Sequence, residues 1–412
     1  MLGVGLGGWL GELCGVNKVG WGVLKILMSL SVVCFSFLRF TFGPQHPASH
    51  GVLCCCCYFI GEYIVLIDCV IGYLHRGTEK LCEFKTLEQS LPYFDRLDYC
   101  SVLCNEHLLT LSFEYLIRCV LSLRLGLIRV LFIEFTRSFN GLLCVGCMLM
   151  DLGSLSPLLW AFEERDKIAT MFDLLCGSRM HCAFICLLGC ADDFSFGLFD
   201  YLLLICVTTT FLLDILDLII VNNRILFLRL RGLSVFCLWD LCFNSISGCL
   251  ARSLGVAWDL RLMISYDLYF LLILDFCICF VGDAFDRFLI RLFDMRMSMI
   301  LCKQLLSLFF IGFVILFDFY FYGDVMIETI ITMFYSIWCF LIPGITYASV
   351  EHPKGEYSIL IVFSLGYCTR LRLRCADFIH LLLIDWFLRG FMLHDLVAFL
   401  GNIDVVFGSV DR

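Results

Sequence analysis

Two histidines lie in a short segment whose composition restricts its conformation. The run Gly43-Pro-Gln-His-Pro-Ala-Ser-His-Gly51 holds His46 and His50 among two prolines and two glycines. Such a composition forbids a helix, so the segment is predicted to be a constrained turn. Histidine changes charge near neutral pH, so either ring could exchange protons there. Taken alone, however, a histidine beside proline and glycine is more often a turn residue whose hydrogen bonds are satisfied.

Cysteine is abundant but is not arranged as a metal site. The chain has 27 cysteines and only two C-x-x-C spacings, Cys54/Cys57 and Cys144/Cys147. Neither spacing has a second pair where a zinc ion or an iron–sulfur cluster would need one. An odd number of scattered cysteines suits a reducing compartment and not a secreted disulfide scaffold. We therefore expect no metal to be bound by this chain alone.

The overall composition points towards a membrane protein, whereas the distribution of charge points away from one. Hydrophobic residues make up 61% of the 412 residues and charged residues 16%. Most uncharged runs are nevertheless shorter than the roughly 20 residues that a spanning helix needs. The strongest candidate span, 329–350, is interrupted by Pro343 and Gly344. A transporter or channel subunit therefore remains only the alternative.

The net charge of −9, without basic clusters among aromatics, disfavours nucleic-acid binding.

The hydrophobic pattern predicts an α+β fold. The chain divides into an N-terminal extension (1–37), a small β region with the histidine loop (38–85), a helical bundle (86–342) and a C-terminal α/β portion (343–412). The extension is Gly-rich and apolar, unlike an Arg-rich transit peptide. In the β region, 38–42 is predicted to be a strand, and 52–66 is predicted to return as the second strand of a hairpin.

Helix signals dominate the middle of the chain. Thr86 and Gln89 have the spacing of a capping box. Ser156 followed by Pro157 predicts the start of a helix that runs to Cys176 and stops at Gly177. Its core-facing stripe is expected to contain Leu159, Phe162, Met171 and Leu175. Further helices are predicted at 201–231 and 283–303, and strands at 346–350 and 357–363.

Several sequence motifs, in a fixed order, extend over most of the chain. They are Phe42-Gly-Pro-Gln-His-Pro-Ala-Ser-His-Gly-Val-Leu53, Leu74-His-Arg-Gly-Thr-Glu-Lys80, Leu91-Pro-Tyr-Phe-Asp-Arg-Leu-Asp-Tyr99, Leu159-Trp-Ala-Phe-Glu-Glu-Arg165, Gly177-Ser-Arg-Met-His181, Val350-Glu351 with Pro353-Lys-Gly-Glu356, and Asp404-Val-Val-Phe-Gly-Ser-Val-Asp-Arg412. Together they resemble the 49 kDa subunit (subunit 7) of respiratory NADH dehydrogenase, complex I. The resemblance covers about residues 38–412.

The resemblance implies a fold similar to the large subunit of nickel–iron hydrogenases. That enzyme holds its metals with one C-x-x-C pair near each end of the chain. Here His75-Arg-Gly-Thr-Glu-Lys80 stands where the first pair would lie, and no cysteine follows Cys375. An active hydrogenase is therefore disfavoured, and the corresponding cavity is expected to receive a quinone headgroup instead.

Quinone reduction takes two electrons and two protons, so the site needs proton donors near both carbonyl oxygens. By resemblance the donors are His50 and Tyr99, and Asp151 orients or recharges His50. His46 and Val406 are expected to line the quinone site. Without the resemblance, Tyr99 could be a core aromatic residue and Asp151 a helix cap.

The resemblance also assigns a group of residues to the electron donor. Arg76, Arg96 and His181 are expected beside a [4Fe–4S] cluster held by a neighbour similar to the twenty-kilodalton subunit. Surface ion pairing, or a helix-end position, is their alternative role. Further expected partners are the thirty-kilodalton subunit and membrane-arm subunits near the point of quinone access, on the matrix side of the mitochondrial inner membrane. The sequence departs from the motifs of the family that it resembles at two positions: Cys54 stands where an arginine is usual, and Ser409 stands where an acidic residue is usual.

Overall fold

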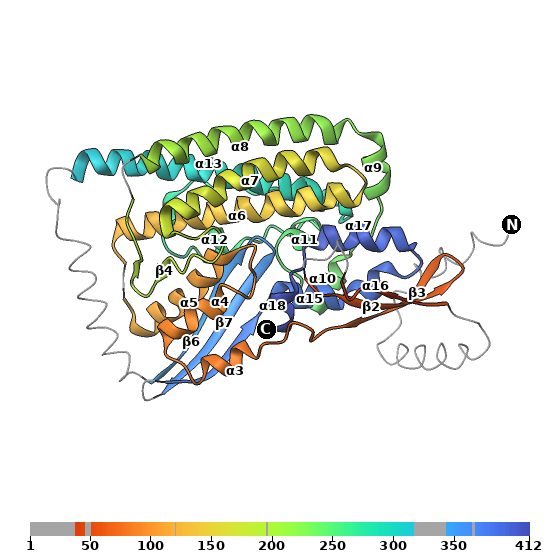
Figure 1. Ribbon diagram of the computed structural model, residues 1–412, viewed down its shortest axis with the longest axis horizontal. Helices are drawn as coiled ribbons and strands as arrows, with labels where there is room; N and C mark the ends of the chain where they lie inside the picture. Colours follow the sequence, from red (N-terminus) through yellow and green to blue (C-terminus); the bar gives the residue numbers. More distant parts are fainter. Residues whose placement is uncertain (1–37, 46–50, 120, 195–196, 317–342, 365–366) are drawn as a thin grey trace.

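The computed structural model describes residues 38–45, 51–119, 121–194, 197–316, 343–364 and 367–412. These residues form an α+β fold, as predicted. Figure 1 shows a layer of long helices, a sheet formed by the C-terminal strands beneath it, and a small N-terminal sheet at one end. Most of residues 329–350, the candidate span, lie outside the described residues, whereas 344–350 belong to a strand.

The N-terminal sheet has three antiparallel strands in the order β1-β2-β3. They are β1 (Leu38–Phe42), β2 (Cys54–Ile60) and β3 (Tyr63–Val70). The strand predicted at 38–42 is confirmed. The single return strand predicted at 52–66 is wrong, because the chain turns at Gly61, whose φ of 64° is a conformation that glycine adopts readily.

The base of the histidine loop is closed by backbone contacts. The Leu53 amide donates to the Pro44 carbonyl at 3.0 Å, and Gln45 bridges Val52. A Cβ atom on Gly43 would lie 1.8 Å from the Leu53 carbonyl oxygen, so only glycine fits there. Residues 46–50, which include both histidines, lie outside the described residues.

Four long helices form the main layer and run side by side in Figure 1. They are α6 (Leu123–Asp151), α7 (Leu155–Cys176), α8 (Leu198–Val221) and α13 (Ala284–Leu316). Helix α6 lies at the centre of the fold, because it packs against α7, α13, α17 (Leu393–Ile403) and α5 (Val102–Ile117). The helix predicted at 283–303 is thus confirmed and continues to Leu316.

Helix α7 ends as predicted but begins earlier. Its C-cap is Gly177 in the left-handed conformation, and its N-cap is Ser154 instead of Ser156. Leu159 is 61% exposed and Phe162 is 39% exposed, so half of the predicted core stripe is wrong. The buried stripe consists of Pro157, Ala161, Glu164, Ile168, Met171, Phe172 and Leu175.

The helix predicted at 201–231 is two helices. Helix α8 ends at Val221, and α9 (Arg224–Leu230) starts anew after Asn223. The Asn223 side-chain oxygen accepts from the Ile225 amide at 3.0 Å, which caps the new helix. The capping box at Thr86 is present as predicted, because the Thr86 amide donates to the Gln89 side chain.

The C-terminal sheet contains the two predicted strands and one more. It has the antiparallel order β6-β7-β8, formed by β6 (Gly344–His352), β7 (Gly355–Ser364) and β8 (Tyr367–Arg374). Strands β6 and β7 pack on α5. The remaining elements are α3 (Thr78–Cys82), α4 (Leu87–Phe94), β4 (Ile185–Cys186), β5 (Gly189–Cys190), α10 (Leu238–Asn244), α11 (Cys249–Arg252), α12 (Leu260–Met263), η2 (Tyr269–Leu271), α15 (Ala376–Leu382), α16 (Ile384–Leu388) and α18 (Phe407–Asp411).

Two helices in the described part of the chain are long and apolar enough to cross a membrane. The apolar window of α6 is 89% buried inside the protein, as expected for a core helix. In Leu198–Ile220, within α8, only 39% of the apolar window is buried. Its exposed side chains include Leu204, Val207 and Phe211. The outer face of α8 is therefore apolar and exposed in the described part of the chain.

Candidate functional site

Tyr99 lies between α4 and α5, where the chain turns into the core. It is half-buried and packs in one small apolar cluster with Val406, Cys100, Leu143 and Cys147. Burial raises the pKa of the Tyr99 phenol. The phenol therefore keeps its proton at neutral pH and is available as an O–H donor. Two of the predicted quinone-site residues, Tyr99 and Val406, are thus brought together from opposite ends of the chain.

Asp151 is the last residue of α6 and is half-buried. Burial raises the pKa of its carboxyl group to about 6. A Cβ atom on Gly401 of α17 would lie 3.0 Å from Asp151 Oδ2, so this backbone approaches the carboxylate closely. Burial raises the pKa of the Cys147 thiol to about 11, and the nearby Asp151 carboxylate adds to the effect. Asp151 therefore lies beside the Tyr99 cluster. Its predicted contact with His50 involves a residue outside the described ones.

A buried ion pair lies directly behind Tyr99. Lys354 Nζ lies 3.0 Å from Asp98 Oδ1 and 2.9 Å from Asp98 Oδ2. Both side chains are inaccessible to solvent. His352 Nε2 lies 3.4 Å from Asp98 Oδ2, and burial and Lys354 lower the pKa of His352 well below its usual range. The imidazole is therefore neutral. Sequence analysis assigned no role to these residues, although Asp98 and Lys354 lie inside two of the motifs.

A second buried set surrounds the end of the chain. The Tyr357 hydroxyl donates to Asp377 Oδ2 at 2.7 Å, and the Ser409 hydroxyl donates to the same oxygen and to the Val406 carbonyl. Burial raises the pKa of Asp377 to about 6. Ser409, which departs from the usual acidic residue, thus supplies a hydroxyl donor to Asp377. The hydrogen bond to its carbonyl helps to fix Val406 in the Tyr99 cluster.

The predicted cluster-facing residues Arg76, Arg96 and His181 are exposed and close together. Arg76 donates to the Arg96 carbonyl at 3.4 Å, and Arg96 donates to the Pro92 carbonyl at 2.6 Å. Partial burial and then Arg96 lower the pKa of His181, and Arg76 adds to the effect. Three separate segments, before α3, after α4 and after α7, therefore present one basic surface. We call these three residues the basic triad.

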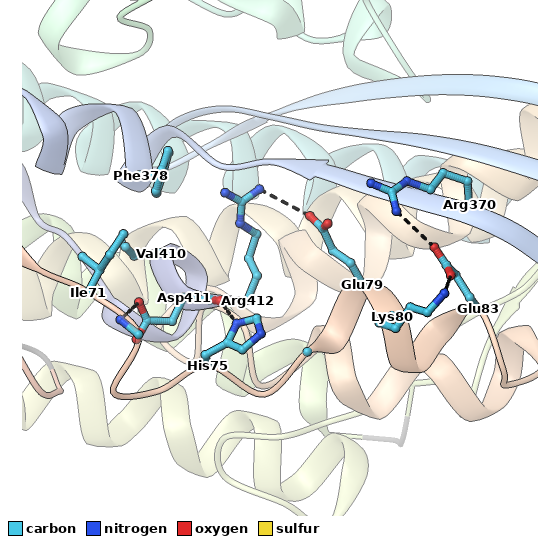
Figure 2. Close-up of a pocket in the computed structure, with 12 residues that line it drawn as sticks. Ile71, His75, Glu79, Lys80, Glu83, Arg370, Phe378, Val410, Asp411 and Arg412 are labelled. Atoms are coloured by element: carbon cyan, nitrogen blue, oxygen red, sulfur yellow. Dashed lines mark hydrogen bonds and ion pairs between the residues drawn. The ribbon is translucent and has the colours of Figure 1, made fainter.

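A cavity of about 430 Å³ is lined by His75 and Gly77, which flank Arg76 in the sequence, and by residues at the chain end. Figure 2 shows that its charged groups pair across it: Arg412 with Glu79, and Arg370 and Lys80 with Glu83. The side of the cavity at His75 is held by the chain end, because Asp411 accepts hydrogen bonds from the Gly72 and Leu74 amides. Such a charged lining suits an apolar ligand poorly. Within the described residues no group of three His, Cys, Asp or Glu side chains is placed to hold a metal ion.

Comparisons with known proteins agree on one family. A family model described as respiratory-chain NADH dehydrogenase, 49 kDa subunit, matches residues 151–412. The chain is 65% identical over 387 residues to the NADH-ubiquinone oxidoreductase 49 kDa subunit homolog of Trypanosoma brucei brucei, covering 93% of this chain and 100% of that protein. It is 40% identical to NADH dehydrogenase [ubiquinone] iron-sulfur protein 2 of Nephroselmis olivacea, covering 90% of this chain and 96% of that protein.

A bacterial relative extends the comparison. The D subunit of the NADH-quinone oxidoreductase of Ehrlichia chaffeensis is 38% identical over 384 residues, which is 91% of this chain and 98% of that protein. These matches define the class as a subunit of a respiratory NADH dehydrogenase. Within it, the chain belongs to the family of the complex I 49 kDa subunit.

Proposed function

We propose that this chain forms the quinone-reduction site of complex I together with a cluster-bearing neighbour. The observation that carries the proposal is the gathering of Tyr99, Val406 and Asp151 at one end of α6, while the basic triad forms a separate surface. The first group suits an apolar headgroup that needs protons. The second suits a partner that carries electrons.

The reaction at this site is the conversion of quinone to quinol. Two electrons, delivered from NADH through iron–sulfur clusters, and two protons reduce both carbonyl oxygens to hydroxyls. The Tyr99 phenol donates one proton and the His50 ring donates the other. The tyrosinate left behind is stabilised by the buried Lys354 ammonium, whose charge acts to lower the Tyr99 pKa against the larger effect of burial. Asp151 orients His50 or returns its proton, with His46 and Val406 lining the site.

The basic triad faces a [4Fe–4S] cluster held by a neighbour similar to the twenty-kilodalton subunit. Positive charge beside a cluster favours its reduced form. His181 has a lowered pKa, so the ring is largely neutral before reduction. The electron added to the cluster then favours protonation of the ring, which links electron transfer to proton uptake.

The same proposal places the chain in its complex. The whole enzyme is a proton-translocating NADH:ubiquinone reductase, and the chain contacts the twenty-kilodalton and thirty-kilodalton subunits and membrane-arm subunits near the point of quinone access. It lies in the matrix-side peripheral arm at the mitochondrial inner membrane. A relative from Neurospora crassa, 38% identical over 380 residues, is named as mitochondrial. Membership of the family and the burial of α6 favour this proposal over a membrane transporter or channel subunit.

Replacing Tyr99 with Phe tests the proposal most directly. The change removes one hydroxyl and keeps the ring, so assembly and NADH oxidation with an artificial electron acceptor are expected to persist. Quinone reductase activity is expected to fall by about 100- to 10,000-fold, the usual contribution of a positioned proton donor. Tyr115→Phe is the matched control, because Tyr115 lies on α5 and is 47% exposed. Undiminished quinone reduction in an assembled Tyr99→Phe complex contradicts the proposal.

A further inference from the structure

Two buried carboxyl groups face each other beneath the basic triad. Asp95 follows the end of α4, and Glu106 lies in the second turn of α5. Their exposed fractions are 1% and 0%. Among the described residues, neither Asp95 Oδ1 nor Glu106 Oε1 has a conventional donor, yet the two carboxyls lie within hydrogen-bonding reach of each other. Two acceptors in this arrangement need a proton between them.

The other bonds of this pair hold the segment that carries His181. Glu106 Oε2 accepts from the Ile185 amide at 2.7 Å. The Asp95 carboxyl accepts from the Ala183 amide, and the His181 ring is hydrogen-bonded to the Asp95 backbone. The two carboxyls therefore anchor the chain on both sides of Phe184 and fix the position of the His181 ring relative to α4.

The surroundings do not neutralise two negative charges. Among the described residues, Arg96 is a cation that acts on Asp95, but its side chain is exposed, and the thiols of Cys182 and Cys186 also face the pair. The contrast with Glu114, two turns further along α5, is clear, because Glu114 lies 2.8 Å from the buried Arg129 guanidinium. An unpaired buried charge is strongly unfavourable, and two in contact are more so.

Electrostatics agrees with the geometry. Burial raises the pKa of Asp95 to about 6. Burial, and then the Asp95 charge, raise the pKa of Glu106 well above its usual range. In such a pair the two titrations belong to both groups jointly, and one proton is retained between them at neutral pH.

We propose that Asp95 and Glu106 share one proton and act as positioning residues for His181, so that the protonation state of the pair controls how readily the His181 ring takes up a proton. This inference rests on the proposed function, in which His181 faces the partner's cluster. Loss of the shared proton would leave two negative charges that repel each other. It would loosen the 181–185 segment and change the field at the His181 ring.

The test uses the intact complex with Glu106→Gln. Glutamine keeps the shape and supplies an amide donor to Asp95, so the net charge near neutral pH stays the same while the shared proton is lost. In infrared difference spectra between oxidised and reduced enzyme, we expect a carboxylic acid C=O band that shifts in D₂O and is lost in the variant. We also expect a changed pH dependence of the cluster midpoint potential, followed by EPR. Glu88→Gln, at an exposed position on α4, should change neither.

Each result decides the inference. A Glu106→Gln complex with an unchanged band and unchanged pH dependence shows that the pair holds no shared proton. A lost band with an unchanged pH dependence overturns the effect on His181. If Glu106→Gln does not assemble, Asp95→Asn, which offers an amide to Glu106, is measured in the same way. Tyr99→Phe is measured in parallel: undiminished quinone reduction there overturns the proposed function, whereas the infrared band still reports on the pair.

Discussion

The surroundings of Tyr99 and the basic triad differ in burial and in how their charged groups are paired. Behind Tyr99, Asp98 and Lys354 are fully buried and paired within this chain. The triad is exposed, and its guanidinium groups bond to backbone carbonyls. Under the proposed function, the fold of this chain alone holds the surroundings of the proton donor, whereas the exposed triad is the surface that a partner would cover. Burial and internal charge pairing therefore distinguish the surroundings of Tyr99 from the exposed triad.

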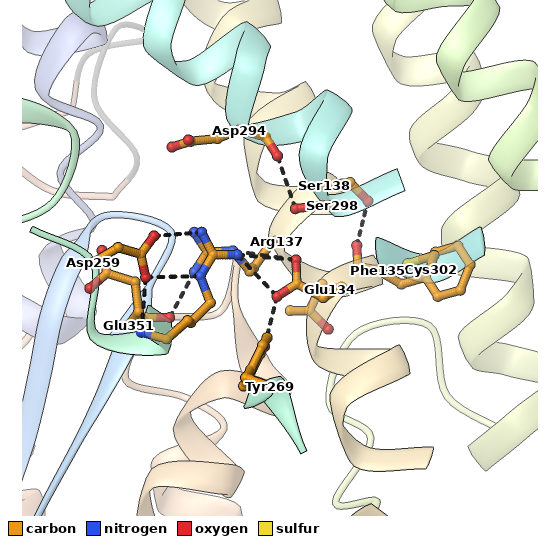
Figure 3. A network of polar contacts seen from close by, with 12 residues as sticks. Glu134, Phe135, Arg137, Ser138, Asp259, Tyr269, Asp294, Ser298, Cys302 and Glu351 are labelled. Atoms are coloured by element: carbon orange, nitrogen blue, oxygen red, sulfur yellow. Dashed lines mark hydrogen bonds and ion pairs between the residues drawn. The ribbon is translucent and has the colours of Figure 1, made fainter. Parts of the chain in front are cut away.

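The Tyr99 side continues into a larger buried network. Glu134 of α6 lies 3.2 Å from the Arg261 guanidinium, which also pairs with Asp259 at 2.7 Å. Figure 3 shows Glu134 beside Tyr269 in this network. The Tyr269 hydroxyl donates to Glu134 at 2.7 Å, and Arg137 donates to the Glu351 carbonyl of β6 at 2.7 Å. Burial raises the pKa of Glu351 to about 7. These contacts tie α6 of the helical layer to β6 of the C-terminal sheet.

Breaking the buried pair behind Tyr99 should have the largest effect. Lys354→Met leaves Asp98 buried without its cation, which costs about 3–5 kcal/mol. We expect the assembled complex to be nearly lost, measured by native gel electrophoresis of mitochondrial membranes. The double variant Asp98→Asn with Lys354→Met leaves no unpaired charge and should recover much of the assembly. Lys80→Met, at a side chain 68% exposed, should have little effect. Equal loss in the double variant would refute the electrostatic reason.

Asp151→Asn should separate stability from activity. The ordinary Asp pKa of 3.8 is raised to about 6 in the fold, so the folded chain binds the proton more tightly than the unfolded chain. The ionised carboxylate therefore destabilises the fold above pH 6, and the effect disappears below the ordinary pKa. The variant should withstand heating better than wild type at about pH 7 but not near pH 4, and its quinone reduction should fall. Asp173→Asn, at an exposed position on α7, is the control. Unaltered activity would exclude Asp151 from proton transfer.

Changing the triad should have the smallest effect, because its members are exposed. Arg96→Gln removes a positive charge that lowers the His181 pKa, so the ring should protonate at slightly higher pH. The pH dependence of the cluster midpoint potential should shift in the same direction. Arg96→Lys retains the charge and should resemble wild type. A shift of equal size in both variants would mean that geometry and not charge is responsible.

Individual helices and strands could be predicted from the sequence, whereas contacts between distant segments could not. Gly177 after an apolar run marked the end of α7, and the short segments 346–350 and 357–363 on either side of a polar turn marked β6 and β7. A clear alternation of charged and apolar residues is present in β8, as Arg370, Arg372 and Arg374, although no strand was predicted there. The break between α8 and α9 could have been seen in the Asn222-Asn223 pair.

The site illustrates the limit more clearly. Asp98 and Lys354 are 256 positions apart, and no periodicity relates them. Tyr99 and Val406 meet in one cluster with Leu143 and Cys147 of α6, a helix that also packs against α5 and α17. The motif resemblance supplied candidate residues, and the fold then showed that Tyr99, Val406 and Asp151 gather on one side. The positions of His46 and His50 remain a prediction.

Gly401 gives the molecule an unexpected point of vulnerability. One added methyl group on α17 would meet Asp151 Oδ2 at 3.0 Å and Met148 Cα at 3.4 Å. The smallest possible enlargement of a residue with no ionisable group would therefore make the Asp151 carboxylate shift by a few tenths of an ångström. A position without any ionisable group thus sets how closely α17 approaches the end of α6, and a single methyl group there would disturb the Asp151 carboxylate.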